Sequence, residues 1–246
     1  MSDETPAPLE PMPEDWETAL AVVAHPDDME YGASGAVARW TDQGKEVAYL
    51  LITAGEAGID AMGPEEVAPL RAAEQRAACA AVGVTDLEIL GHPDGMLTYG
   101  LELRRDIARV IRRTRPELVI TLNHRDTFGP GALNMADHKV VGQATMDAVR
   151  DAANRWVFRE MTDEGLEPWA GVRWVAVSGS PEATHATDVS TTLDRSVASL
   201  AAHRVYLEGL GPGPLGDPDA FLRRMAEGSA ARFGGVPCTT FELLSM

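Results

Sequence analysis

The sequence predicts an α/β protein with a doubly wound, mostly parallel, Rossmann-like sheet and helices on both faces. Two observations carry this prediction. Short apolar runs alternate with longer segments of helical spacing along the 246 residues, and polar, chemically reactive side chains follow directly after several of the apolar runs. Buried parallel strands appear in sequence as continuous apolar runs, and ligands bind at the carboxyl ends of such strands. We therefore expect the functional site at that edge of the sheet.

The strand and helix patterns can be placed in order along the chain. Strands are expected over residues 18–24, 46–53, 85–90, 117–122, 172–178, 185–189 and 239–246. Helices are expected over residues 32–43, 65–82, 101–114, 136–153, 192–207 and 219–232. Gly44 and Gly83 fit C-caps of the first two helices, and Pro116 stops the third.

The length suits one domain with a sizeable core. Residues 1–15 are acidic and rich in proline, so we expect a flexible tail followed by a single domain over residues 16–246. The tail lacks the apolar segment of a signal peptide, and no run is long enough for a transmembrane helix. The two cysteines, Cys79 and Cys238, lie in or beside apolar segments, which favours core packing in a reducing compartment. These features predict a cytoplasmic protein.

The charge of the chain restricts its partners. Lys and Arg number 21 against 38 Asp and Glu, which gives a formal net charge of −17. Such acidity disfavours nucleic acid and anionic membranes, and it favours a neutral or cationic small molecule or a metal ion. The arginines between residues 104 and 115 are expected to form a solvated helix face. The sequence leaves open whether the chain forms a homo-oligomer.

The sequence His25-Pro26-Asp27-Asp28 directly follows the first predicted strand. Pro26 fixes its own φ and favours an extended His25, so the imidazole is held by stiff backbone. Two adjacent carboxylates in a turn point in different directions, so one can bind a metal while the other faces the water that the metal activates. An aspartate here also commonly caps a helix. Capping accounts for one carboxylate and not for the whole cluster.

Residues 24–28, with Glu30 close by, resemble the signature of the PIG-L/LmbE superfamily of zinc-dependent N-deacetylases. Members of this superfamily remove acyl groups from amino sugars and related amides. The resemblance implies an LmbE-like deacetylase domain, one Zn²⁺ per chain, and a small-molecule N-acyl amino sugar or conjugate as the substrate. The expected activity is hydrolysis of the amide with release of an acyl group. Among acyl groups, acetyl is the one that we expect.

The resemblance also implies roles for individual residues. His138 opens a predicted helix and would join His25 and Asp28 as metal ligands, with a fourth position left for water as in catalytic zinc sites. Asp137 would support a neighbouring ring or the metal shell from the helix N-terminus. Asp27 would take a proton from the attacking water and later deliver one to the departing amine.

Arg71 and Asp94 are the candidates for substrate binding. Arg71 belongs to an Arg-x-x-Glu pattern with Glu74 that the superfamily carries after its second strand, where the arginine can reach substrate oxygens. The alternative is an ordinary ion pair one helical turn apart. Asp94 lies in a His-Pro-Asp-Gly segment, where the superfamily tends to place an aspartate for sugar hydroxyls. Pro-Asp-Gly is also a good turn former by itself.

One position differs from the family pattern. Many members carry His-Pro-Asp-His where this chain has Met135-Ala136-Asp137-His138, and a thioether cannot donate a hydrogen bond to an oxyanion. His124, after the fourth predicted strand, is the candidate replacement, with a hydrogen-bonded loop histidine as the alternative. Met135 also motivates a second hypothesis, a metal- or sugar-binding relative that has lost turnover.

A nucleotide-binding Rossmann module is a third hypothesis. A phosphate needs a glycine-rich turn with free N–H groups at the first strand end, and this chain places carboxylates there. The carboxylates would repel phosphate. His203, late in the helix predicted over residues 192–207, is expected to be structural.

Overall fold

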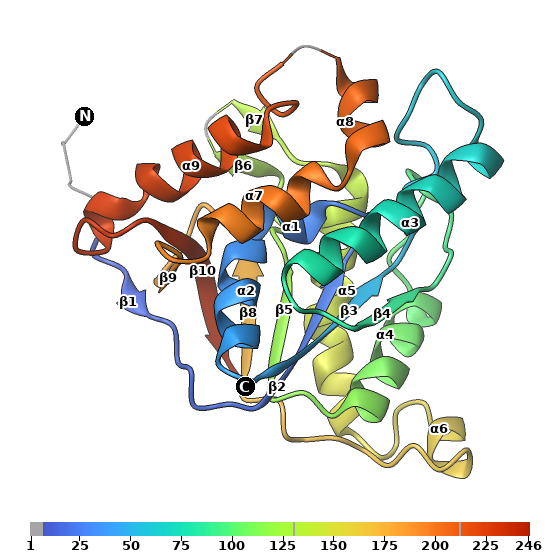
Figure 1. The fold of residues 1–246 in the computed structure, drawn as a ribbon. Coiled ribbons are helices and arrows are strands. Elements are labelled where there is room, and N and C mark those ends of the chain that lie inside the picture. Colours follow the sequence, from blue (N-terminus) through green and yellow to red (C-terminus); the bar gives the residue numbers. More distant parts are fainter. Residues whose placement is uncertain (1–6, 130, 212) are drawn as a thin grey trace.

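The computed structural model describes residues 7–129, 131–211 and 213–246. An eight-stranded sheet forms its centre, and helices cover both faces (Figure 1). The strands are β1 (Glu10–Pro11), β2 (Thr18–Val23), β3 (Glu46–Leu51), β4 (Asp86–Ile89), β5 (Leu118–Leu122), β8 (Trp174–Ser178), β9 (His185–Asp188) and β10 (Cys238–Ser245). A separate hairpin consists of β6 (Thr127–Gly129) and β7 (Ala132–Leu133).

The order of strands is β1-β9-β10-β8-β5-β2-β3-β4. The five strands from β8 to β4 are parallel, whereas β10 runs antiparallel to both of its neighbours. The predicted doubly wound, mostly parallel sheet is confirmed. From β2 the chain builds outward to β3 and β4 on one side and to β5 and β8 on the other. The carboxyl ends of β2 and β5 therefore meet at the topological switch point, where such sheets bind ligands.

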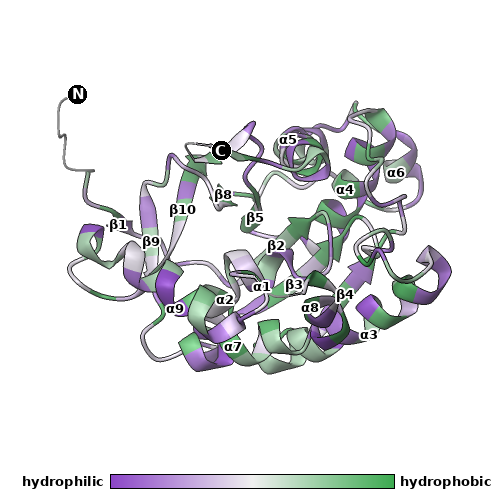
Figure 2. Cartoon of the chain, turned by 90° about the horizontal axis from the view of Figure 1, so that it is seen from above, coloured by the Kyte–Doolittle hydropathy of each residue, from purple (hydrophilic) through white to green (hydrophobic). Residues whose placement is uncertain are grey.

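The helices form two layers, one on each face of the sheet (Figure 2). One layer holds α1 (Asp28–Gly32), α2 (Ser34–Asp42), α3 (Pro64–Ala81), α7 (Leu193–Ala201), α8 (Arg204–Leu210) and α9 (Pro218–Gly228), followed by the 3₁₀ turn η1 (Ala230–Arg232). The other holds α4 (Leu101–Thr114), α5 (Ala136–Ala153) and α6 (Glu160–Asp163). Because both faces are covered, β5 is buried along its whole length and β2 along all but its first residue.

Two predicted helices are broken in the structure. The segment expected as one helix over residues 32–43 forms α1 and α2, with Ala33 between them at φ −151°. The helix expected over residues 192–207 divides into α7 and α8 at His203, whose side chain is fully buried. The break brings His203 inside the molecule, which a periodicity argument along one helix does not anticipate.

The structure differs from the expected flexible tail over residues 7–15. β1 pairs in parallel with β9, and Leu9 and Met12 are buried. The apolar side chains of this otherwise acidic segment therefore pack against the domain. Residues 1–6 lie outside the described residues.

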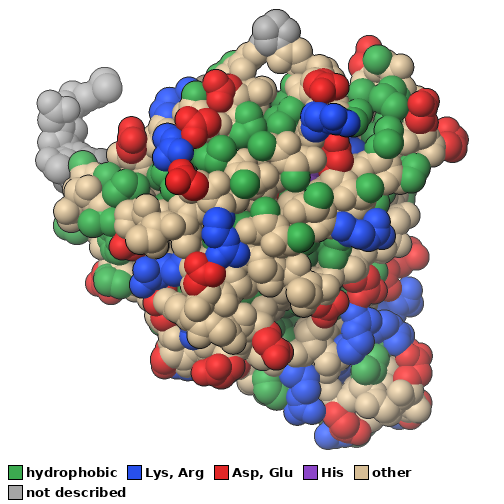
Figure 3. All heavy atoms as spheres, viewed as in Figure 1, with side chains coloured by type: hydrophobic (Ala, Val, Ile, Leu, Met, Phe, Trp, Pro, Cys, Tyr) green, Lys and Arg blue, Asp and Glu red, His purple; other side chains and the backbone are tan. Residues whose placement is uncertain are grey.

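Three arginines of α4 pair with acidic side chains of other elements, whereas Arg112 is buried and donates to backbone carbonyl oxygens. Arg104 binds Asp151, Arg109 binds Glu164, and Arg113 binds Glu88. Lys and Arg side chains accordingly lie beside Asp and Glu at the lower right of Figure 3, the region of α4 and α6. Much of the positive charge of this helix is thus paired within the chain. None of the described helices is long and apolar enough to cross a membrane.

Candidate metal centre

The centre begins in the turn that joins β2 to α1. His25 and Asp28 follow directly after β2, which is buried at its carboxyl end, so their side chains lie at the switch point. Asp27 occupies the left-handed region, at φ 84° and ψ −17°. This conformation is uncommon for a residue with a Cβ atom, and such strain persists only where the surroundings fix it. The turn is therefore held in one shape by its neighbours.

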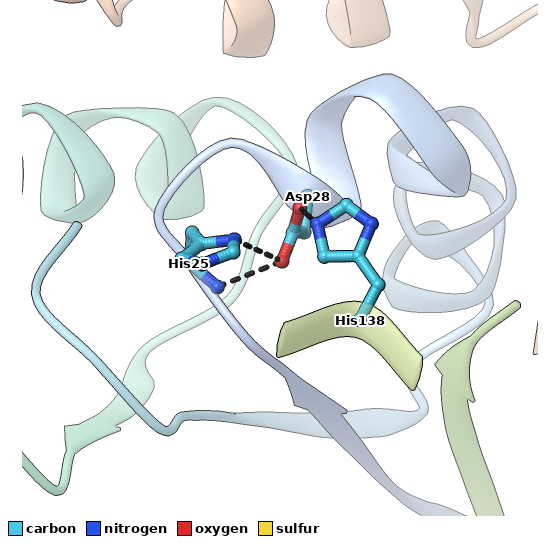
Figure 4. A group of neighbouring side chains, drawn as sticks. All are labelled: His25, Asp28 and His138. Atoms are coloured by element: carbon cyan, nitrogen blue, oxygen red, sulfur yellow. Dashed lines mark hydrogen bonds and ion pairs between the residues drawn. The ribbon is translucent and has the colours of Figure 1, made fainter. Parts of the chain in front are cut away.

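Asp28 lies between the two imidazoles of the cluster (Figure 4). Its Oδ2 accepts a hydrogen bond from the backbone N–H of His25 at 2.7 Å and lies 3.6 Å from His25 Nδ1. Its Oδ1 lies 3.0 Å from Nε2 of His138, which projects from the first turn of α5. One ligand atom from each of the three residues falls within 4.8 Å of the others. The three predicted metal ligands are therefore brought together from segments 110 residues apart in sequence.

The ring of His138 supports a metal at this position. It is buried, and neither ring nitrogen makes a hydrogen bond with any of the described residues, in spite of the short contact to Asp28. A buried polar atom without a partner costs about 1–3 kcal/mol. Two imidazoles and one carboxylate that converge in this way are a donor set suited to a divalent metal.

His25 is oriented by two carboxylates on its far side. Its Nε2 lies 3.0 Å from Asp94 Oδ1 and 3.4 Å from Asp137 Oδ2, which leaves Nδ1 toward Asp28. Asp137 is itself anchored by the backbone N–H groups of Gly95 and Leu97. Carboxylates behind a ligating histidine fix its orientation and raise its basicity.

The electrostatics of the centre favour positive charge. Burial alone would lower the pKa of His25, but hydrogen bonds to Asp137 and Asp28 outweigh it and raise the pKa to about 12. The pKa values of Asp28, Asp94 and Asp137 are all lowered, because the neighbouring histidines outweigh the opposing effect of burial. A ring of buried carboxylates is the environment that a metal cation needs, and it repels phosphate.

Asp27 has a different environment from Asp28. Burial raises its pKa to about 7, and the guanidinium of Arg71, at 2.8 Å from Oδ2, opposes this rise. Two adjacent carboxylates thus differ in proton affinity. A carboxyl group with a pKa near neutrality is suited to accept and return a proton.

Arg71 and Asp94 are not free to the solvent. Arg71 is 3% exposed and donates to Asp27 Oδ2 and to the carbonyl oxygens of Pro26 and Gly55. Asp94 uses one oxygen for His25 and the other for the N–H of Ala57. The structure therefore places both residues in the support of the cluster. Glu74, the alternative partner for Arg71, instead accepts from the N–H of Val205.

His124 lies outside the cluster of three ligands. It packs against Gly142 of α5, one helical turn beyond His138. A Cβ atom on Gly142 would lie 2.8 Å from the Cβ of His124. No hydrogen bond or ion pair among the described residues joins it to His25, Asp28 or His138, and its Nδ1 is buried without a partner. Burial and the nearby Arg125 lower its pKa. Met135, at the N-cap of α5, is 55% exposed.

Three further residues border the site and were not predicted from the sequence. Gln75 accepts a hydrogen bond from the N–H of Asp27, Tyr206 lies 4.0 Å from the Arg71 guanidinium, and Phe128 meets the ring of His138 edge to face at 6.0 Å. Gln75 follows Arg71 by four residues, so helical spacing could have placed both on one face. The other two depend on long-range packing.

The similarity of this chain to known proteins agrees with this geometry. The family model described as GlcNAc-PI de-N-acetylase, PIG-L, matches residues 20–149, just over half of the chain, and the match includes His25, Asp28 and His138. The chain belongs to the PIG-L family. The expected superfamily resemblance is confirmed.

Two curated relatives of this PIG-L protein are named as deacetylases. The diacetylchitobiose deacetylase of Thermococcus kodakarensis is 28% identical over 191 residues, which cover 77% of this chain and 70% of the relative. A probable N-acetyl-α-D-glucosaminyl L-malate deacetylase 2 of Bacillus cereus is 29% identical over 201 residues, covering 78% and 84%.

A solved structure has the same fold. The N,N′-diacetylchitobiose deacetylase from Pyrococcus horikoshii superimposes with a TM-score of 0.82 and 24% identity, covering 94% of this chain and 85% of that one. At this identity the likeness concerns the fold alone. Because the superposition covers 94% of the chain, it extends beyond residues 20–149, the part that the PIG-L model matches.

Proposed function

We propose that this PIG-L protein is a zinc-dependent N-deacetylase that hydrolyses the acetamido group of an amino sugar or a related small conjugate. The observation that carries the proposal is the cluster of His25, Asp28 and His138 beside Asp27, a buried carboxyl group with a pKa near 7. The names of the two curated relatives support a substrate that contains N-acetylglucosamine.

The metal would be held by His25, Asp28 and His138. Two imidazoles and one carboxylate are typical of a catalytic zinc site that keeps a coordination position open. Zinc bound there would supply Lewis-acid chemistry, activating a water molecule and polarising the acetyl carbonyl. Asp94 and Asp137 hold the ring of His25 so that Nδ1 faces the metal position.

Asp27 is assigned the proton transfers. It takes a proton from the attacking water and returns one to the departing amine, for which a pKa near 7 is well matched. Arg71 binds one of its carboxylate oxygens, Oδ2, so the transfer is assigned to the other. The positive charge of Arg71 opposes the rise in the pKa of Asp27 that burial causes.

The contacts to substrate are proposed with two changes from the expectation. Because Arg71 and Asp94 are engaged by Asp27 and His25, we assign them to orientation of those residues, with contacts to sugar oxygens secondary. His124 remains our proposed partner for the oxyanion in place of the family histidine at Met135. His124 packs against Gly142 of α5, one helical turn from His138, and this position supports the assignment.

A cytoplasmic setting is part of the proposal. Cys79 and Cys238 are both free and buried, which supports a cytoplasmic, reducing compartment. The buried carboxylates of the centre favour a neutral substrate over a phosphorylated one.

The test combines metal content with amine release. Wild type and His138→Ala are dialysed and their zinc is measured, and both are assayed for free amine from N-acetylglucosamine, diacetylchitobiose and N-acetylglucosaminyl malate. We expect about one zinc per chain and turnover of at least one substrate in the wild type, and the loss of both in the variant. Zinc without amine release from any of the three would support the relative that has lost turnover.

A further inference from the structure

The structure assigns Gln75 as a positioning residue that fixes the main chain of Asp27. The assignment rests on the proposed function of Asp27 as the group that moves protons. Gln75 lies on α3, is 1% exposed and is outside the ligand cluster. Its side chain contacts the backbone of Asp27 and not its carboxylate.

The peptide group between Pro26 and Asp27 is held at both ends. Its carbonyl oxygen accepts a hydrogen bond from Arg71 Nη2 at 2.5 Å, and its N–H donates to Gln75 Oε1 at 3.0 Å. Arg71 Nη2 also binds the Asp27 carboxylate at 2.8 Å. A fixed peptide plane and a fixed carboxylate together define the torsion about the N–Cα bond of Asp27. Two side chains one turn apart on α3 therefore maintain the left-handed φ of 84°.

The orientation of the Gln75 amide is determined by a buried carboxylate. Its Nε2 donates to both oxygens of Glu30, at 3.2 and 3.3 Å, so Oε1 must be the atom that faces the N–H of Asp27. Glu30 has no exposed surface, and it also accepts from Ser199 Oγ. His203 Nε2 lies 3.5 Å from it, at the break between α7 and α8. The hydrogen bond between Gln75 and the N–H of Asp27 thus depends on residues from both halves of the chain.

A side chain that only fills space would not need this chemistry. Methionine has nearly the same length as glutamine, but it would leave the N–H of Asp27 and the carboxylate of Glu30 without their partners. Because the left-handed conformation is disfavoured for aspartate, we expect the turn to relax when the N–H is released. The carboxyl group would then shift relative to the metal ligands, and a shift of about 1 Å is enough to reduce turnover about 100-fold.

The kinetic test exchanges the two polar groups. Gln75→Met removes the acceptor of the Asp27 N–H, and Gln75→Glu places a second carboxylate against Glu30, which would repel it from its position beside Asp27. Each is expected to lower kcat about 100-fold with KM changed less than about threefold, because proton transfer and not binding is affected. In the double variant Glu30→Gln with Gln75→Glu, the new glutamine donates to the new carboxylate, which accepts the N–H of Asp27. We expect this exchange to restore kcat to within about tenfold of wild type. Gln143→Met, at an exposed position of α5, is the matched control and should behave as wild type.

A structural readout separates this assignment from the proposed function. Crystal structures of Gln75→Met and of the double variant are compared with wild type, and zinc is measured in each. We expect Asp27 to leave the left-handed region in Gln75→Met and to keep it in the double variant, with zinc retained in both. An Asp27 that keeps its φ in Gln75→Met, or a double variant no more active than Gln75→Glu, would overturn the assignment.

Two further outcomes would still test the role of Gln75. If Gln75→Met does not fold, the comparison of Gln75→Glu with the double variant tests the same exchange. If the wild type hydrolyses no N-acetyl sugar, the proposed function fails, whereas the torsion of Asp27 in the crystal structures still confirms or refutes the role of Gln75.

Discussion

His138 combines burial with two ring nitrogens that make no hydrogen bond among the described residues. In a histidine kept for packing, at least one nitrogen would be expected to find a partner, because a buried unsatisfied nitrogen lowers stability by about 1–3 kcal/mol. The cost is explained if the nitrogen that faces Asp28 serves as a ligand. The conflict between burial and hydrogen bonding is therefore informative about function at the level of one side chain.

The carboxyl group of Asp27 is expected to be needed for turnover but not for metal binding. Asp27→Asn keeps the size of the side chain and tolerates the left-handed conformation, but the amide cannot accept a proton. We expect turnover to fall about 100- to 10,000-fold while the zinc content stays at the wild-type level. Amine release and elemental analysis on the same preparation measure the two quantities. Normal turnover in this variant would remove Asp27 from the mechanism.

The same reasoning distinguishes Asp28 from its neighbour. Asp28→Asn removes a charged ligand between two imidazoles, so we expect zinc to be lost together with activity. Asp27→Asn, whose side chain faces Arg71, serves as its control. Equal zinc retention in both variants would contradict the division of roles between the two carboxylates.

At the scale of elements, α5 is positioned by a close approach to the end of β5. A Cβ atom on Gly142 would lie 2.7 Å from the carbonyl oxygen of Leu122 and 2.8 Å from His124 Cβ. The contact involves backbone, which cannot move aside as a flexible side chain would. The absence of a side chain at Gly142 thus lets His138 reach the switch point.

Gly142→Ala is therefore expected to destabilise the protein by about 1–3 kcal/mol in spite of the better helix propensity of alanine. Gly228→Ala, at the end of α9 where nothing lies within 4 Å, is the control and should be neutral or slightly stabilising. Urea unfolding of both variants measures the difference. A stable Gly142→Ala would show that α5 can shift away from β5 at little cost.

An ion pair between the segment after β5 and β10 is expected to be sensitive to pH. Arg125, after β5, binds both oxygens of Glu242 in β10, and Ser180 donates to the same carboxylate. Burial raises the pKa of Glu242, but these hydrogen bonds outweigh it and the net pKa is lowered from 4.5. A carboxylate whose pKa is lowered in the folded state stabilises the fold at pH values above its ordinary pKa. This stability is lost as the pH falls from the ordinary pKa through the lowered one.

We accordingly expect Glu242→Gln to lose about 1–3 kcal/mol of unfolding free energy at pH 7. The difference from wild type should narrow as the pH is reduced below 4.5. Urea unfolding at several pH values gives both curves. A gap that is independent of pH would mean that the charge of Glu242 contributes nothing.

The elements were predictable to different degrees. The parallel strands and the long helices α3, α4 and α5 follow from apolar periodicity and from glycine and proline punctuation. The three candidate metal ligands were identified from a local motif and its resemblance to a family. The roles of Gln75, Glu30 and His203 were not identified in this way, because they depend on α3 and the α7–α8 break meeting behind the turn after β2. Contacts of that kind are set by tertiary packing and leave no local pattern.

Arg71 shows the same limit from the other side. Its type and spacing suggested a substrate ligand, but only the fold shows that its Nη1 and Nη2 groups donate to Asp27 and to two backbone carbonyls. A charged residue in a motif can act on the substrate or on the residue beside it, and sequence alone does not separate the two.

For the whole molecule, the metal should contribute to the stability of the fold. A ligand that binds only the folded state stabilises it by about 2.7 kcal/mol at 100 times its Kd, which for a chain of this size raises Tm by about 5–10 °C. We expect this rise when zinc is added to the chelator-treated wild type, and none in His138→Ala. His185→Ala, in β9 away from the cluster, should keep the rise. An equal shift in His138→Ala would place the zinc elsewhere on the acidic surface.

The ligands come from the turn after β2 and from α5, on opposite sides of the switch point. A bound ion would therefore act as a cross-link between the two halves of the sheet, closing a loop as long as those closed by the widest disulfides. The three donors come together only where β5 is paired with β2 and α5 is docked beside them. Incompletely folded chains would present two of the three donors at most and would bind the ion weakly. Metal capture would then mark the completion of folding, and a metal-starved cell would accumulate chains that unfold more readily.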